Sequence, residues 1–284
     1  MTPADAAGAA RARPVPLPPR GTPWVGTSWK MTKTRAQGLA WARGLTDGLA
    51  ARGRGPGDVA GPAAPQVFCV PPATALAEVS ALLAGRAPHV LVGAQDAHWE
   101  DAGAWTGELS VPQVADAGAR LVEVGHSERR EHFGDTDARV ALKVRAVLRH
   151  GLVPLLCVGE PAAVRSGGGH VEHVLDQVRR CVGTLPDEEA ARVVVAYEPV
   201  WAIGSSGRPA RPAEVAEVVE PLVADAGGRV AAVLFGGSVD AAGAPDLLSV
   251  PGVDGLFVGR AAWDVTGFLG LLDLVGAAGD APPG

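Results

Sequence analysis

Residues 193–204 read VVVAYEPVWAIG, an unbroken apolar run that leads into an acidic residue, Glu198, and then into a loop with large apolar side chains. The run does not alternate between apolar and polar residues, which is typical of a strand buried on both faces of a parallel sheet. Seven further runs share this character: residues 24–28, 66–70, 89–94, 121–125, 153–158, 230–235 and 255–258. Parallel strands need crossover connections, so we expect helices between the runs.

The segments between these runs carry apolar residues at three- and four-residue spacing, as an amphipathic helix requires. Examples are residues 34–51, 137–150 and 170–182. A single (β/α)₈ barrel takes about 250 residues, and the chain has 284. Eight strand–helix units in that length predict an α/β fold with one closed parallel barrel, rather than an open sheet.

The two ends of the chain differ in composition from its middle. Residues 1–21 are rich in Ala, Arg and Pro and lack an aromatic residue, and residues 277–284 are similar. Prolines at positions 14, 16, 18 and 19 interrupt any apolar segment that could act as a secretion signal. We expect a disordered leader over residues 1–21, the barrel domain over residues 22–276 and a C-terminal tail over residues 277–284.

The composition excludes several classes of function. Lys and Arg number 25 against 31 Asp and Glu, a net charge of −6, so the chain lacks the positive field that a nucleic-acid partner requires. Its apolar runs are too short to cross a membrane, and we expect a cytoplasmic protein. Cys69, Cys157 and Cys181 are far apart in the sequence, which argues against a disulfide framework or a zinc site. We expect no metal and no organic cofactor.

The active site of such a barrel is built where the strands end. Lys30 follows the first run, His126 the fourth and Glu198 the sixth. Backbone N–H groups at a helix start favour a neutral imidazole for His126. Taken alone, each has an ordinary interpretation: a surface charge for Lys30, a structural histidine, and an ion pair between Glu198 and Lys30. Their common position at strand ends favours a catalytic site.

The loops after the last three runs are typical of a lid and an anion site. Residues 199–210 have large apolar side chains in the middle and small residues or prolines at both ends, as suits a lid that moves as one piece and excludes water. Gly236, Gly237 and Ser238 follow the seventh run, and Gly259 and Arg260 follow the eighth. Glycines expose backbone N–H groups that can surround a phosphate.

With these motifs, the chain resembles the triosephosphate isomerase family, whose fold is the (β/α)₈ TIM barrel. The resemblance extends from about residue 24 to residue 268, and its most specific motifs are AYEPVWAIG and GHSERR. The matching stretches are SWKM (28–31), GAQ (93–95), GAWTGELS (103–110), VGHSERR (124–130), LCVGE (156–160), AYEPVWAIG (196–204), GGSV (236–239) and DGLFVG (254–259).

The resemblance implies an aldose–ketose isomerase, an intramolecular oxidoreductase that acts on a phosphorylated sugar through an enediolate. Glu198 would be the catalytic base, His126 the group that polarises the substrate carbonyl, and Lys30 the cation that stabilises the enediolate. Glu128 would contact these groups rather than the substrate and hold them in position. Thr106, in the GAWTGELS loop, would reach into a second subunit, so the resemblance implies a homodimer.

The resemblance also assigns the lid and the phosphate site. Backbone N–H groups of Gly204, Ser238, Gly259 and the following residue, Arg260, would bind the phosphate. The lid would comprise Pro199, Trp201, Ile203, Gly204 and Ser205.

Four positions depart from the pattern of triose enzymes. Ser28 stands where these usually have Asn, Arg260 where they have Gly, Phe235 where they have Tyr, and residues 205–207 where they have Thr-Gly-Lys. Ser28 would leave room at the reacting end of the substrate. These departures, with the GTSWKM start and the GLFVGRAAWD end, favour the branch that isomerises erythrulose phosphates, with L-erythrulose 1-phosphate as the expected substrate.

Three other functions stay open. One is a triosephosphate isomerase that interconverts dihydroxyacetone phosphate and glyceraldehyde 3-phosphate, in glycolysis and gluconeogenesis rather than polyol breakdown. Another is a barrel that binds a sugar phosphate without chemistry. The last is a structural role, which no feature of the sequence supports.

Overall fold

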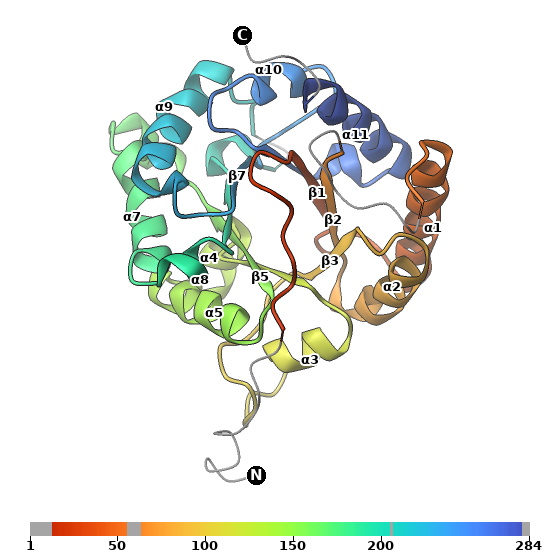
Figure 1. The fold of residues 1–284 in the computed structure, drawn as a ribbon. Coiled ribbons are helices and arrows are strands. Elements are labelled where there is room, and N and C mark those ends of the chain that lie inside the picture. Colours follow the sequence, from red (N-terminus) through yellow and green to blue (C-terminus); the bar gives the residue numbers. More distant parts are fainter. Residues whose placement is uncertain (1–12, 56–63, 205–206, 280–284) are drawn as a thin grey trace.

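The computed structural model describes residues 13–55, 64–204 and 207–279. Its eight strands pair in parallel in the order of the sequence, and β1 also pairs with β8, so the barrel is closed (Figure 1). The strands are β1 Trp24–Ser28, β2 Gln66–Val70, β3 Leu91–Ala94, β4 Leu121–Val124, β5 Val153–Val158, β6 Val194–Tyr197, β7 Ala232–Phe235 and β8 Gly255–Val258. The predicted (β/α)₈ barrel is confirmed.

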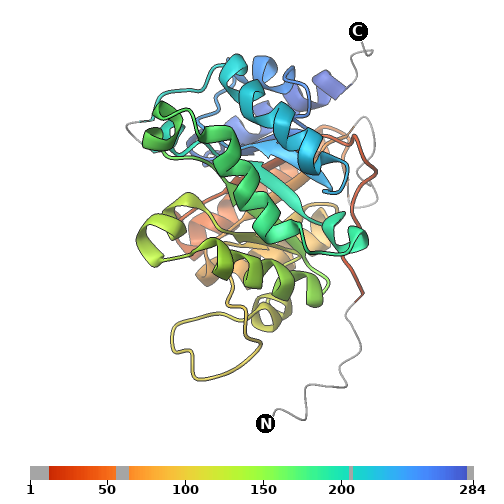
Figure 2. The same cartoon turned by 90° about the vertical axis from the view of Figure 1, so that its left-hand side faces the viewer.

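Helices surround the barrel, because each crossover places a helix on its outer face (Figures 1 and 2). The α-helices are α1 Arg35–Ala51, α2 Ala73–Arg86, α3 Val111–Asp116, α4 Ser127–Phe133, α5 Asp137–Arg149, α6 Ala162–Ser166, α7 His170–Val182, α8 Asp187–Ala190, α9 Pro212–Leu222, α10 Ala244–Leu248 and α11 Val265–Gly279. Shorter helical turns are η2 Val200–Ala202, η3 Val223–Gly227 and η4 Arg260–Ala262. In the described part of the chain, no helix is both long enough and apolar enough to span a membrane.

Two apolar clusters make up the core. One lies between the strands and the helices, and the other fills the barrel. Inside the barrel, Phe68 stacks on Phe257 with ring centroids 5.6 Å apart, and it occupies the space that a side chain at Gly26 would need. Successive residues of a strand face opposite sides. The unbroken apolar runs of the sequence therefore supply both clusters at once.

Part of the predicted leader closes the end of the barrel at which the strands begin. Residues 13–22, red in Figure 1, cross this end, and the Val15 N–H donates to the Gly151 carbonyl at 2.8 Å. Val15 is 4% exposed and belongs to the interior cluster, against which Leu17 also packs. Residues 13–21 are thus not a disordered tail, because their apolar side chains fill the barrel opening; residues 1–12 lie outside the described residues.

A long loop leaves the body of the barrel between β3 and α3. Residues 95–110, yellow in Figure 2, project to one side. Trp105 is 49% exposed and Leu109 is 39% exposed, and Thr106 between them is also exposed. The loop thus presents apolar side chains to its surroundings.

Candidate active site

Lys30 lies just beyond the end of β1 in a strained turn. Its φ of 50° is in the left-handed region, which a residue other than glycine rarely occupies. Gln95 stabilises the turn, since its Nε2 donates to the Lys30 carbonyl at 2.8 Å. The Lys30 ammonium donates to Glu128 Oε1 at 2.8 Å. Backbone strain held by neighbouring groups is a common property of functional sites.

His126 is the N-cap residue of α4 and is buried. Its Nδ1 accepts a hydrogen bond from the backbone N–H of Glu128 at 3.2 Å, so a neutral ring carries its proton on Nε2. Burial and the nearby charge of Lys30 lower the pKa of His126 to about 4, although Glu128 opposes this. The imidazole is therefore a neutral donor, as its place at a helix start predicts.

Glu198 directly follows β6 and is 4% exposed. Its Oε2 lies 3.7 Å from His126 Nε2 and has no hydrogen-bond partner in the part of the chain that the structure describes. Burial raises the pKa of Glu198 to about 8, the charge of Glu123 adds to the increase, and Lys30 opposes it. A Cβ at Gly236 would come within 2.7 Å of Glu198 Cγ, so the residue after β7 must be glycine to leave this carboxylate in place.

Glu128 contacts both Lys30 and His126. It accepts from Lys30, and its Oε2 lies 3.7 Å from His126 Nδ1. Burial raises its pKa, but the hydrogen bond and charge of Lys30 outweigh this and lower it overall. Glu128 therefore holds Lys30 in place as a carboxylate.

A cavity of about 520 Å³ opens above these residues, within the range of small-molecule sites. It is lined by Lys30, His126, Glu128 and Glu198 together with the predicted substrate-binding residues Ser28, Gly204, Ser238, Gly259 and Arg260. The loops after β7 and β8 both contact residues 199–204 of the predicted lid. Ser238 Oγ donates to the Ala202 carbonyl at 2.6 Å, and Arg260 donates to the Gly204 carbonyl at 3.0 Å.

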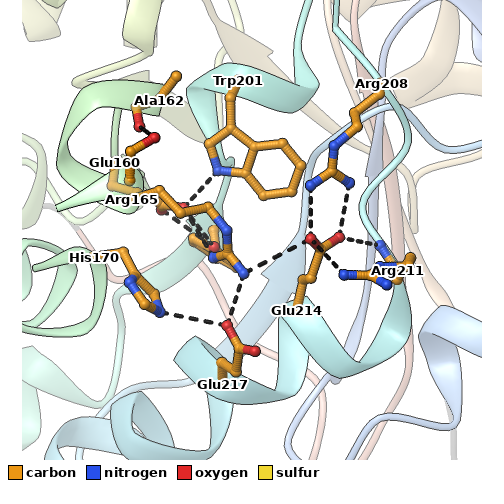
Figure 3. A network of polar contacts seen from close by, with 11 residues as sticks. Glu160, Ala162, Arg165, His170, Trp201, Arg208, Arg211, Glu214 and Glu217 are labelled. Carbon is orange, nitrogen blue, oxygen red and sulfur yellow. Dashed lines mark hydrogen bonds and ion pairs between the residues drawn. The ribbon is translucent and has the colours of Figure 1, made fainter. Parts of the chain in front are cut away.

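The base of the lid is fixed by a network of polar contacts (Figure 3). The Trp201 indole lies between the guanidinium groups of Arg165 and Arg208, 4.9 and 4.4 Å from its ring centroid. Its Nε1–H donates to the buried Glu160 at 2.7 Å. The Tyr197 hydroxyl also donates to Glu160. Arg208 in turn makes two hydrogen bonds to Glu214, at 2.6 and 2.8 Å.

The remaining predicted residues belong to the predicted lid and to the projecting loop. Ile203 lines the cavity, but Pro199 and Trp201 do not; they belong to the base of the lid. Thr106 lies in the projecting loop, away from the cavity. Ser205 lies outside the described residues.

Sequence reasoning missed Glu123. This residue of β4 is 3% exposed and accepts a hydrogen bond from Ser28 Oγ at 2.8 Å. Burial raises the pKa of Glu123 to about 7, and the Ser28 hydrogen bond opposes the increase. The signal was present, because an acidic residue stands inside the otherwise apolar run 121–125.

The site contains a buried carboxylate, a neutral imidazole and an ammonium group around one cavity. This set can remove a proton from a carbon next to a carbonyl and stabilise the oxygen that gains charge. The fold and the site therefore define an isomerase class that works through an enediolate at the C-terminal end of a (β/α)₈ barrel.

Comparisons with known proteins show which family the chain belongs to. The model of the triosephosphate isomerase family matches residues 23–275. An L-erythrulose-1-phosphate isomerase of Mycolicibacterium smegmatis is 48% identical over 254 residues, which cover 89% of this chain and 93% of that protein. An L-erythrulose-1-phosphate isomerase of Rhizobium meliloti is 47% identical over 261 residues, which cover 90% of this chain and 97% of that protein.

A solved structure agrees with this result. The triosephosphate isomerase of Bartonella henselae is 32% identical, with a TM-score of 0.75 over 89% of this chain and 98% of that one. The chain belongs to the triosephosphate isomerase family. It is an isomerase, an intramolecular oxidoreductase, as the resemblance implied.

Proposed function

We propose that the protein isomerises L-erythrulose 1-phosphate. The observation that carries this proposal is that relatives with 44–48% identity along most of the chain bear that name, whereas the triosephosphate isomerase structure is 32% identical. The short side chain at position 28 supports a four-carbon substrate. The short side chain of Ser28 lines the cavity beside the reacting groups, so it leaves space for an additional hydroxymethyl group.

The proposed reaction moves a proton and a carbonyl along the carbon chain. In the tetrulose phosphate, C1 carries the phosphate and C2 the carbonyl, so Glu198 takes the proton of C3. His126 Nε2–H and the Lys30 ammonium stabilise the negative oxygen on C2 of the enediolate. Glu198 then returns a proton to C2, His126 moves the hydroxyl proton from O3 to O2, and the carbonyl stands at C3.

The two candidate substrates differ in their product. A triose phosphate has its reacting carbon at the end of the chain, so the reaction joins a ketose and an aldose. In L-erythrulose 1-phosphate the reacting carbons are C2 and C3, so the product is again a ketose phosphate. The lid has a definite task in both cases, since an enediolate next to a phosphate ester eliminates phosphate unless it is held in a dry site.

Steady-state kinetics of the purified protein test the substrate. We expect kcat/KM for L-erythrulose 1-phosphate to exceed that for dihydroxyacetone phosphate by about tenfold or more, a difference of ~1.4 kcal/mol in transition-state binding. Glu198→Gln, purified in parallel, controls for isomerase of the expression host. Better turnover of the triose overturns the proposal in favour of a triosephosphate isomerase. Turnover of neither substrate, with sugar-phosphate binding retained, points to a binding barrel.

We further propose that two copies associate through the loop of residues 95–110, because its Trp105 and Leu109 are exposed apolar side chains. Met31, next to Lys30, is also exposed and offers a second apolar surface for a partner copy. Thr106→Arg should then give a monomer in sedimentation velocity, while Thr266→Arg on α11 should leave the dimer intact. A wild-type protein that sediments as a monomer contradicts this expectation.

The cytoplasm is the proposed location. All three cysteines are free and buried, which is typical of proteins in a reducing compartment. A role in carbohydrate metabolism follows from a phosphorylated sugar substrate.

A further inference from the structure

Glu123 is a buried acidic residue, and the stability of the barrel does not explain its presence. On β4, Leu121 belongs to the barrel interior and Val122 and Val124 to the outer cluster. Because sides alternate along a strand, Glu123 faces the interior. A carboxylate in an apolar interior destabilises the fold unless it is compensated, and an apolar residue of similar size would avoid that cost. The position therefore points to a task in the site above it.

Ser28 connects Glu123 to the cavity. It lies four residues after Trp24, an interior residue of β1, and its side chain faces the same side of the strand. Its hydroxyl donates to Glu123 Oε2 at 2.8 Å, and Ser28 itself lines the cavity. The hydrogen bond runs between β1 and β4, which are not neighbours in the sheet, so it crosses the barrel beneath the site.

This hydrogen bond fixes what Ser28 offers to a substrate. A serine hydroxyl has one proton and two lone pairs. Because the Ser28 hydroxyl donates its proton in the hydrogen bond to Glu123, the side of Ser28 Oγ that faces the cavity is a hydrogen-bond acceptor. An acceptor is unsuited to a carbonyl or a phosphate, because both are acceptors themselves. It suits a hydroxyl group of the substrate.

We propose that Ser28, oriented by Glu123, accepts a hydrogen bond from the terminal hydroxymethyl group of a four-carbon ketose phosphate and so selects it over substrates that lack this group. The inference rests on the proposed function. Lys30 and His126 are donors for the oxygen that gains charge, and Gly204, Ser238, Gly259 and Arg260 line the same cavity and are the predicted phosphate site. Glu123 is a positioning residue in this arrangement, and Ser28 the residue that touches the substrate.

The test compares L-erythrulose 1-phosphate with its 4-deoxy analogue, which lacks only the terminal hydroxyl. The measured quantity is the ratio of kcat/KM for the two compounds, which a merely structural defect does not change because it affects both. For the wild type we expect a ratio of about 10 to 100, since an unpaired buried acceptor costs ~1–3 kcal/mol.

Ser28→Ala should reduce this ratio to about threefold or less, because the acceptor is gone. Glu123→Leu removes the acceptor of the Ser28 hydrogen bond, so the serine proton is free to point toward the cavity and the ratio should fall as well. Thr27→Val is the matched control. It removes the neighbouring hydroxyl of β1, which does not line the cavity, and should preserve the wild-type ratio.

Each result has one meaning. A wild type that does not turn over the tetrulose phosphate refutes the proposed function. A wild type that turns it over with a ratio near one overturns the inference alone. The inference is also overturned if Ser28→Ala and Glu123→Leu both keep the wild-type ratio, even if both variants are slow.

Discussion

Glu198 and Glu123 show how the barrel interior controls acidity at single residues. Both carboxyl groups are buried, 4% and 3% exposed, so water solvates their negative charge poorly. Burial is the main cause of the raised pKa of each, and the charge of Glu123 raises the pKa of Glu198 further. A carboxylate that binds its proton more tightly is a stronger base, which proton abstraction from carbon requires.

The same shift predicts how stability depends on pH. The pKa of Glu198 rises from 4.5 to about 8 on folding, so the folded state holds a proton that the unfolded state has released. Its contribution to the free energy of unfolding is fully present below pH 4.5 and is lost as pH rises toward 8. Glu123 acts in the same direction between pH 4.5 and about 7. Both contributions are lost as pH rises, so the folded protein should be less stable at pH 8 than at pH 5.

Glu198→Gln should separate these effects. Urea unfolding of the variant should show a weaker decline in stability between pH 7 and 8 than the wild type, because Gln cannot ionise. The kcat of the variant should fall by about 10²–10⁴-fold, as expected when a general base is removed. The exposed Glu220→Gln on α9 is the control and should retain the wild-type pH dependence. If Glu198→Gln declines as steeply as the wild type above pH 7, the burial argument is wrong.

At the scale of elements, the lid depends on contacts from the helices beside it. Arg208 lies against Trp201 and forms an ion pair with the buried Glu214 at the start of α9. Hydrogen bonds from Arg208 hold the pKa of Glu214 well below its usual range. These contacts anchor the second end of the lid to the body of the barrel.

Arg208→Ala should loosen the lid without unfolding the protein. We expect kcat/KM to fall by about tenfold, and more inorganic phosphate to be released per isomerisation, because water reaches the enediolate. A phosphate assay alongside the isomerase assay measures both. Arg211→Ala is the matched control, since Arg211 also contacts Glu214 but does not cover Trp201. Unchanged partitioning in Arg208→Ala would show that this anchor does not control closure.

At the scale of the whole molecule, the barrel has two ends with separate tasks. The cavity lies at the end of the strands, while residues 13–22 close the other end with Val15 and Leu17. A change at the closed end should therefore affect stability but not chemistry.

Val15→Asp tests this separation. It places a charge in the barrel opening and removes apolar burial worth about 1.5–3 kcal/mol, so Tm should fall by at least ~3 °C. The kcat should stay within about twofold of the wild type, since the site is remote. Pro16→Asp, at an exposed neighbouring position, is the control for added charge. Equal Tm values for the two variants would contradict a closing role for Val15.

The positions of the main site residues were predictable because a parallel barrel brings the ends of its strands to one rim. Lys30, His126 and Glu198 each follow an apolar run, and closure of the barrel is enough to assemble them. Other features were not predictable from order alone. The hydrogen bond between Ser28 and Glu123 joins residues 95 positions apart on strands that do not pair. The anchoring of Trp201 needs three side chains from other parts of the chain, those of Glu160, Arg165 and Arg208.

The sequence by itself determined the barrel, its eight strands and the residue types at their ends, since those follow from local apolar runs and their spacing. The tertiary structure alone decided what the pattern left open: that residues 13–21 pack into the barrel, that Glu123 lies under the site and that its charge acts on Glu198. Burial and charge–charge interactions depend on distances through space, and these exist only once the barrel has closed.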